Sequence, residues 1–366
     1  MANAMPSLVG WLSLLVSTLV VACDSEDDRI SELDSLRIIG VKSDQPFAAP
    51  NSRVSLEMLV DDASSKAVSK DGTRRQPKLL WFGSCVNPAG DLYYKCFPQL
   101  HESMSSISDE ELNGGKETEN TANARLGFGS SYQLNVPADT IESRPKANGI
   151  SSPYGVVMMF YAACGGQLRV RRNADVESNY PISCVDPDTG KELNQSEFEF
   201  GFYPIYVYES LKNNIPIVTS IDFAAEASGK DCTSDDDCEK SESCGSKAVC
   251  IPRISACKKG EKCKNYKLNL SVDQKSVEPA VSAYIPEAEA PRETLWVSYY
   301  SDFGEFEKDA RIIHDGASGY TKDYAGIWTP KVTEESPSTP REAHVYAVVR
   351  DNRGGVTWVS KDVRVE

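Results

Sequence analysis

Residues 344–360 read His344-Val-Tyr-Ala-Val-Val-Arg-Asp-Asn-Arg-Gly-Gly-Val-Thr-Trp-Val-Ser360. Two runs of β-branched and aromatic residues flank the polar, glycine-containing segment from Asp351 to Gly355, and this pattern is a strong signal for a β-hairpin. We therefore predict that the chain ends in two antiparallel strands, 344–350 and 356–365.

Similar short runs, separated by Pro, Gly, Asn and Asp, begin at Leu36, and they are typical of an all-β sandwich or barrel. The expected strands of a first unit are 36–41, 54–60, 79–82, 132–136, 156–162 and 198–208. Pro204 indicates a bulge or an edge position in the last of these. A second all-β unit begins near Pro216, with further strands at 217–223, 266–272 and 295–300. We predict domains at 36–212 and 213–366.

The first unit opens with Ile39-Gly-Val-Lys-Ser-Asp-Gln-Pro-Phe-Ala-Ala-Pro-Asn-Ser-Arg-Val-Ser-Leu56, which resembles the first two strands of bacterial immunoglobulin-like domains. Leu295-Trp-Val-Ser-Tyr-Tyr300 and the segment from Val345 to Gly355 resemble the central Trp strand and final hairpin of the same class, including its polycystic-kidney-type variants. The resemblance implies an all-β fold of two immunoglobulin-like sandwiches. It says almost nothing about function, because sandwiches have many unrelated roles.

One segment of the first unit differs from the strand pattern. Ser108-Asp-Glu-Glu111 is typical of a capping box at a helix N-terminus, and Gly114-Gly115 and polar residues follow it. We interpret residues 103–123 as a surface insertion.

Cysteines dominate residues 231–263 of the second unit. This stretch has almost no apolar residues for a core, so we expect disulfides to hold it, and it resembles the small disulfide modules of secreted bacterial proteins. A zinc site is disfavoured, because no Cys-x-x-Cys or nearby His is present. Local pairing is preferred for the four cysteines of the first unit, and the connectivity of the six others is open. The disulfide candidates are Cys85, Cys96, Cys164, Cys184, Cys232, Cys238, Cys244, Cys250, Cys257 and Cys263.

The N-terminus carries an export signal. Leu8 to Ala22 is an uncharged apolar run, too short to span a bilayer comfortably, and is typical of a signal-peptide core. Val20-Val-Ala-Cys23 resembles the lipobox of bacterial lipoproteins, which implies cleavage after residue 22 and acylation of Cys23. The pattern departs from that family because no Lys or Arg precedes the run. The alternatives are a short membrane anchor or an ordinary secretory signal.

A lipoprotein of this kind is held in the cell envelope. We expect residues 23–35 to form a lipidated acidic linker, and the protein to be anchored to the inner or outer membrane, facing the periplasm or the exterior. Eleven cysteines minus the acylated one leave an even ten, which suits an oxidising compartment. With 39 basic and 54 acidic residues, a net charge of −15 disfavours nucleic acid as a partner.

We find no sequence motif of catalysis. The chain lacks a Gly-x-Ser-x-Gly elbow, a His-Glu-x-x-His motif and a phosphate-binding loop, and it has three histidines. Asp235, Asp236 and Asp237 are weak calcium candidates, because their spacing does not match an EF-hand loop. No cofactor is expected.

Tryptophans provide the remaining candidate contacts. Trp81 and Trp296 are expected in the cores, whereas Trp328 and Trp358 are the candidates for ligand-facing aromatic residues.

We therefore expect a non-catalytic, membrane-tethered envelope lipoprotein that binds a protein or a glycan. The alternatives are a structural accessory subunit of an envelope or secretion assembly and, third, an enzyme with an unrecognised site.

Overall fold

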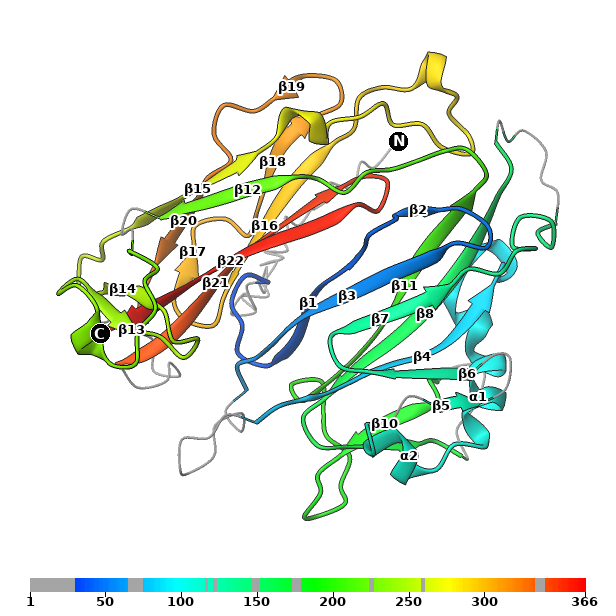
Figure 1. The fold of residues 1–366 in the computed structure, drawn as a ribbon, viewed down its shortest axis with the longest axis horizontal. Coiled ribbons are helices and arrows are strands. Elements are labelled where there is room, and N and C mark those ends of the chain that lie inside the picture. The colour runs from blue at the N-terminus through cyan, green and yellow to red at the C-terminus, as the bar shows by residue number, and fades with distance from the viewer. Residues whose placement is uncertain are drawn as a thin grey trace, which may run out of the picture.

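The computed structural model describes residues 30–64, 75–115, 118–120, 124–145, 150, 152–172, 179–223, 227–257, 261–332 and 340–366. These residues form an all-β fold of two sandwiches, as predicted (Figure 1). Each sheet takes its strands either from before residue 209 or from after residue 217, within the described ranges. The domain boundary at 212/213 stays a prediction.

The first sandwich pairs a three-stranded sheet, in the order β1-β3-β7, with a six-stranded sheet, β2-β11-β8-β4-β6-β5, and a β9–β10 hairpin flanks it. Its inner core contains Trp81, stacked on Tyr132, and alternate residues of β8 and β11. The strands are β1 (Leu36–Ser43), β2 (Phe47–Ala48), β3 (Arg53–Asp62), β4 (Lys78–Val86), β5 (Thr118–Asn120), β6 (Ala124–Phe128), β7 (Ser131–Asn135), β8 (Tyr154–Cys164), β9 (Gln167–Val170), β10 (Ile182–Val185) and β11 (Phe198–Tyr208).

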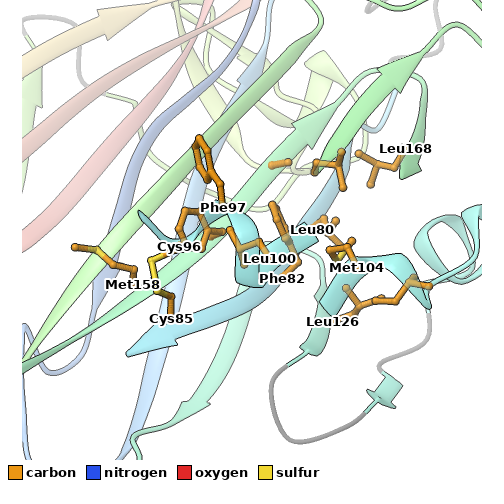
Figure 2. Packing of buried hydrophobic residues seen from close by; sticks show 14 of the residues in the cluster. Leu80, Phe82, Cys85, Cys96, Phe97, Leu100, Met104, Leu126, Met158 and Leu168 are labelled. Carbon is orange, nitrogen blue, oxygen red and sulfur yellow. A yellow bond between two sulfur atoms is a disulfide. The ribbon is translucent and has the colours of Figure 1, made fainter. Parts of the chain in front are cut away.

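The outer face of the six-stranded sheet has a core of its own, which short helices cover. These are η2 (Tyr93–Cys96), α1 (Phe97–Ser105) and α2 (Asp109–Asn113), and η1 (Ala89–Asp91) precedes them in the loop after β4. Figure 2 shows Leu100 and Met104 of α1 packed beside Leu80 and Phe82 of β4. Gly83 permits this contact, since it has a φ of +60° and a Cβ there would lie 2.4 Å from Leu100 Cδ2.

The predicted surface insertion is therefore partly wrong. The capping box exists, because Ser108 Oγ accepts from Glu111 N at 3.1 Å and the Glu111 carboxylate accepts from Ser108 N at 2.7 Å. However, Met104, Ile107 and Leu112 of this segment are fully buried in the outer core. The sequence does not predict their burial, because the segment is mostly polar. Residues 116, 117 and 121–123 lie outside the described residues.

The second sandwich pairs a four-stranded sheet, β12-β15-β20-β17, with a seven-stranded sheet, β13-β14-β22-β21-β16-β18-β19. The predicted hairpin is confirmed, since β21 and β22 pair antiparallel from Arg341↔Val365 to Arg350↔Val356. The strands are β12 (Val218–Phe223), β13 (Glu242–Cys244), β14 (Cys250–Ile254), β15 (Tyr266–Val272), β16 (Leu295–Ser301), β17 (Glu305–Phe306), β18 (Ala310–Asp315), β19 (Gly319–Tyr320), β20 (Gly326–Thr329), β21 (Arg341–Asp351) and β22 (Val356–Val365), with short helices η3 (Asp235–Asp237), η4 (Gln274–Ser276) and η5 (Glu287–Glu289).

The cysteine-rich module, residues 227–257 and 261–263, is continuous with this sheet. Its strand β14 pairs parallel with β22, with Arg253 opposite Arg364 and Ile254 opposite Val365. Ala256 N also donates to the carbonyl of Glu366 at 2.7 Å. The module therefore covers the edge that β22 would otherwise expose.

The two sandwiches pack directly against each other. Tyr346 and Val348, on the outer face of β21, bury their side chains with Ile39 of β1. The Tyr346 hydroxyl donates to Asp61 at 2.6 Å, and Arg350 donates to the carbonyl of Ile39 at 2.8 Å. Because β21 also supplies the core of its own sandwich, it is buried on both faces.

A buried arginine at the tip of the last hairpin strengthens this contact. Arg353 is 9% exposed and donates to Glu293 at 2.5 Å, to Glu278 at 2.8 Å and to the carbonyl of Lys212 at 3.1 Å. Its guanidinium also lies 5.3 Å from the ring centroid of Phe47 in β2. Hydrogen bonds and ion pairs of this kind are needed to offset the cost of burying its charge.

The end of the predicted linker is packed rather than free. Ser31 and Leu33 are buried, and their backbones exchange hydrogen bonds with Ser301 at the end of β16. Leu33 joins the apolar cluster between the sandwiches. Residues 1–29, including the predicted signal peptide and Cys23, lie outside the described residues. Among the described residues, no helix is both long and apolar enough to cross a bilayer.

Replacement of Leu33 by alanine should destabilise the protein, because it leaves a cavity between the sandwiches. We expect a loss of about 2 kcal/mol or more in the free energy of unfolding, measured by urea titration of tryptophan fluorescence. Ile30→Ala is the matched control, since Ile30 is 65% exposed and its loss should change stability by at most about 0.5 kcal/mol. Equal unfolding midpoints for the two variants would show that the segment is not docked.

Candidate functional site

A disulfide-closed loop stands out on the surface of the first sandwich. The Cys85–Cys96 disulfide links the end of β4 to the start of α1 and closes the loop between them. Asn87 anchors the loop to the sheet, because its side chain accepts from Val156 N at 2.9 Å and donates to the carbonyl of Thr140 at 2.7 Å. The loop is therefore held at both ends by the disulfide and near its start by the side chain of Asn87.

This loop presents three large side chains to solvent, Leu92, Tyr93 and Tyr94. The ring of Tyr93 stacks on Phe202 of β11, with centroids 4.1 Å apart and an interplanar angle of 13°. Tyr94 is nearly perpendicular to Tyr93, at 85°. The two rings thus offer surfaces in two directions on a rigid base.

A loop from the second sandwich adds two more exposed apolar side chains, Tyr284 and Ile285. This loop, between β15 and β16, reaches the ends of β8 and β11 (Figure 1). Ala283 is buried there and its N–H donates to the Tyr208 hydroxyl at 3.3 Å. Tyr284 itself is 61% exposed.

We call Leu92, Tyr93, Tyr94, Tyr284 and Ile285 the tyrosine surface. These five are among only nine exposed large apolar side chains in the described residues. Each of the two loops exposes two or three of them in succession, and grouped exposure of this kind marks an interaction site more often than scattered exposure does.

A polar cluster joins the two halves of this surface. Arg144 donates to both carboxylate oxygens of Asp91, at 2.7 and 2.9 Å, and to the Tyr154 hydroxyl at 2.7 Å. The Tyr154 hydroxyl donates to Asp91 at 2.9 Å and lies 3.3 Å from the hydroxyl of Tyr284. Because Asp91 directly precedes Leu92, this cluster fixes the position of the exposed loop relative to Tyr284.

Electrostatics keep the hydroxyl of Tyr154 protonated and Arg144 charged. Burial raises the pKa of Tyr154, and its hydrogen bonds with Tyr284 and Asp91 raise it further, so the hydroxyl stays protonated. Burial alone would lower the pKa of Arg144, but the hydrogen bond and the charge of Asp91 raise it overall. The cluster therefore supplies fixed polar contacts.

The predicted cysteines are all paired. The local pairs Cys85–Cys96 and Cys164–Cys184 are confirmed. The module has two interlocked disulfides and one separate one, Cys232–Cys244, Cys238–Cys250 and Cys257–Cys263.

Both tryptophans predicted to face a ligand have other roles. Trp328 is 0% exposed and its indole N–H donates to the carbonyl of Phe303 at 2.9 Å, so that prediction is wrong. The strand β20 lies between β15 and β17, and the side-chain alternation places Trp328 inside. Trp358 is half-buried between the sandwiches, with the Lys42 ammonium 4.0 Å from its ring centroid.

Trp296 was expected in the core and is half-buried instead. Leu295 and Val297, its neighbours on β16, point into the core, so Trp296 points to the other face of the sheet. Tyr299 and Trp328 are the large aromatic residues that fill the core in place of Trp296. Trp81 is fully buried as predicted.

Two acidic residues of the module accept hydrogen bonds from other groups of the same chain. Asp235 accepts from Ser243 at 2.7 Å and from Arg253 at 2.7 Å, and Asp237 accepts from Thr233 N at 2.7 Å. Hydrogen bonds from Ser243 and Thr233, respectively, lower the pKa of these two carboxylates. They stabilise η3, and a role for Asp235, Asp236 or Asp237 in calcium binding stays a prediction.

The tyrosine surface was missed from the sequence. The only available clue was a pair of adjacent tyrosines, Tyr93 and Tyr94, between two cysteines and outside any strand pattern. Tyr284 is about 190 residues further along the chain, and nothing local indicates that it lies nearby.

No family model matches the chain, and no curated protein matches it. Among solved structures, it is similar to dimeric latent PorU from Porphyromonas gingivalis, with 10% identity and a TM-score of 0.18, over 92% of this chain and 24% of that chain. The native conformation of E. coli alpha-2-macroglobulin gives 10% identity and a TM-score of 0.17, over 92% of this chain and 16% of that chain. Three N-terminal domains of the bacteriophage RB49 Hoc protein give 8% identity and a TM-score of 0.16, over 91% of this chain and 99% of that chain. The chain thus spans a quarter or less of the first two proteins, and likeness at this level carries no argument about fold or function.

Removal of the Cys85–Cys96 disulfide, by the double substitution Cys85→Ala and Cys96→Ala, should loosen the exposed loop. We expect faster hydrogen exchange at residues 87–96, and a loss of about 2–4 kcal/mol in unfolding free energy. Removal of Cys257–Cys263 is the control and should leave exchange at 87–96 unchanged. If the first variant also leaves it unchanged, the disulfide is not what holds the loop.

Proposed function

We propose that this protein is a non-catalytic, membrane-tethered lipoprotein of the cell envelope that binds a protein partner through the tyrosine surface. The observation that carries the proposal is that a polar cluster of Asp91, Arg144 and Tyr154 joins Tyr284 to a disulfide-closed loop, and that both loops expose large apolar side chains. A rigid base reduces the entropy lost when these side chains bind.

The composition of the surface favours a protein over a glycan. Tyrosine and arginine are enriched at protein interfaces, and large apolar anchors there supply most of the binding energy. Leu92 and Ile285 are aliphatic, so they gain from contact with another apolar surface and gain little from a sugar. Glycans instead require flat rings surrounded by free polar groups, whereas Asp91 and Arg144 are already bonded to each other.

Two of the three histidines lie against backbone carbonyls, which supports a non-catalytic role for them. His314 is buried and its Nδ1 lies 2.6 Å from the carbonyl of Glu293. The Nε2 atom of His101 lies 2.8 Å from the carbonyl of Asn179. Neither belongs to the tyrosine surface, and the Tyr154 hydroxyl of the polar cluster beneath it has a raised pKa, mainly because of burial.

The structural alternative, an accessory subunit of an envelope or secretion assembly, would use the same surface for permanent packing. The two differ in stoichiometry: a subunit is recovered from detergent-solubilised membranes in a fixed complex, whereas a binding protein is recovered with its partner only when that partner is present.

A photo-crosslinking amino acid at Tyr94 or Tyr284 tests the surface in intact cells. We expect one discrete protein adduct, the same from both positions, identified by mass spectrometry. Tyr320 is the matched control, because it is an exposed tyrosine on the second sandwich and does not belong to the tyrosine surface; it should give no such adduct.

The affinity of the identified partner then provides a quantitative test. Tyr94→Ala and Tyr284→Ala should each weaken binding about tenfold or more, as expected for a central aromatic anchor. Unchanged affinity, absence of a shared adduct, or saturable binding of a glycan in its place would overturn the proposal.

The anchor has a separate test. Intact mass of the protein extracted from membranes should correspond to a chain that starts at Cys23 and carries acyl chains. Cys23→Ala should remove the acyl mass and release the protein from the membrane fraction. An unmodified N-terminus, or membrane retention of the variant, contradicts the lipid anchor and leaves the tyrosine surface unaffected.

A further inference from the structure

Three side chains with metal-ligating atoms converge on the last hairpin. Glu342 and His344 are two residues apart on β21, so they lie on the same face, and His344 pairs directly with Asp362 on β22. A carboxylate oxygen of each acidic residue and a ring nitrogen of His344 all lie within 4.8 Å of one another. Each residue is half-buried, so the cluster is accessible to solvent.

The donor set is suited to a transition metal. Zn²⁺ binds imidazole nitrogen and carboxylate oxygen, and a set of three protein ligands leaves its fourth position for water. Because ligands bind Zn²⁺ at about 2.0–2.2 Å, neighbouring donors of a tetrahedral site lie about 3.4 Å apart. The His344 Nδ1 and Asp362 Oδ1 atoms are 2.8 Å apart, so small side-chain rotations would open this distance for a metal.

Outer hydrogen bonds orient these ligands, as they do around metals in general. Ser246 of the cysteine-rich module donates to the Glu342 carboxylate from its N at 2.7 Å and from its Oγ at 2.8 Å. Asp302 accepts from the backbone N of His344 at 2.7 Å. The carboxylate of Glu342 and the backbone of His344 are thus held in place by groups that a metal ion need not displace.

A lysine already pairs with one of the three ligands. Lys247 Nζ lies 2.6 Å from Asp362 Oδ2, and its side chain is 62% exposed. An exposed ion pair of this kind contributes little to stability, so a divalent ion could displace the lysine into solvent at small cost.

We propose that Glu342, His344 and Asp362 bind one divalent transition-metal ion, with Zn²⁺ as the best match, in exchange for Lys247. This site is separate from the tyrosine surface and does not depend on its function. Ser246 and Lys247 belong to the cysteine-rich module, so the ion would act where that module meets the hairpin.

The test uses the mature chain with its disulfides intact and without a histidine tag. Calorimetry with ZnCl₂ should show one equivalent bound, and Co²⁺ should give visible absorption bands typical of tetrahedral coordination. Asp362→Asn and His344→Ala should each weaken Zn²⁺ binding about 100-fold or more, since even loss of an outer partner costs about 10–100-fold.

Two controls separate coordination from general effects. Lys247→Met should strengthen Zn²⁺ binding about two- to fivefold, because it removes the competing cation, whereas a purely structural ion pair predicts no such gain. His101→Ala should bind Zn²⁺ unchanged, since His101 lies on α1 of the other sandwich. Circular dichroism in metal-free buffer verifies that each variant is folded.

Absence of Zn²⁺ and Co²⁺ binding at millimolar concentrations would overturn the site. So would binding that survives both Asp362→Asn and His344→Ala, or that His101→Ala abolishes. If His344→Ala does not fold, the Co²⁺ spectrum of Asp362→Asn decides the outcome, because loss of the tetrahedral bands reports on coordination and a change in local charge alone does not.

Discussion

The burial of β21 on both faces is the constraint on which the rest of the structure depends. Consecutive side chains of a strand point to opposite faces, so Val345, Ala347 and Val349 fill the second sandwich while Tyr346 and Val348 pack on the first. Separation of the sandwiches would expose this outer row to water. The tyrosine surface, which draws on loops from both sandwiches, exists only while this contact is maintained.

The strands could be predicted because burial leaves a periodic mark. The run Phe198–Tyr208 coincides with β11, and the final hairpin was read correctly from its polar turn. Pro204 fits the edge-like position that was predicted, since β2 pairs with only Tyr206 and Val207 of β11. Which face of a strand a residue occupies is harder to predict: Trp296 is expected in the core because sandwiches place an aromatic residue there, but in β16 Leu295, Val297 and Tyr299 occupy the inner face.

The candidate site could not be predicted, because it belongs to no single element. Tyr94 and Tyr284 come together only through the packing of two sandwiches, and exposure of a loop residue has no periodic signature. Met104 and Ile107 illustrate the opposite failure, because a segment rich in serine and glutamate still supplied fully buried anchors. The cysteine pairs within the first sandwich were predictable, since local loops close most easily, whereas the interlocked pairs of the module required the structure.

If Cys23 carries a lipid, the docking of Ser31 and Leu33 beside Ser301 limits the distance between that lipid and the fold. Seven residues lie between Cys23 and Ser31, so eight steps of about 3.3–3.6 Å each limit this segment to about 29 Å when fully extended. A short tether would keep the protein at a high effective concentration for partners embedded in the same membrane. A weak intrinsic contact would then suffice for a membrane neighbour, while more distant molecules would have to diffuse to the protein.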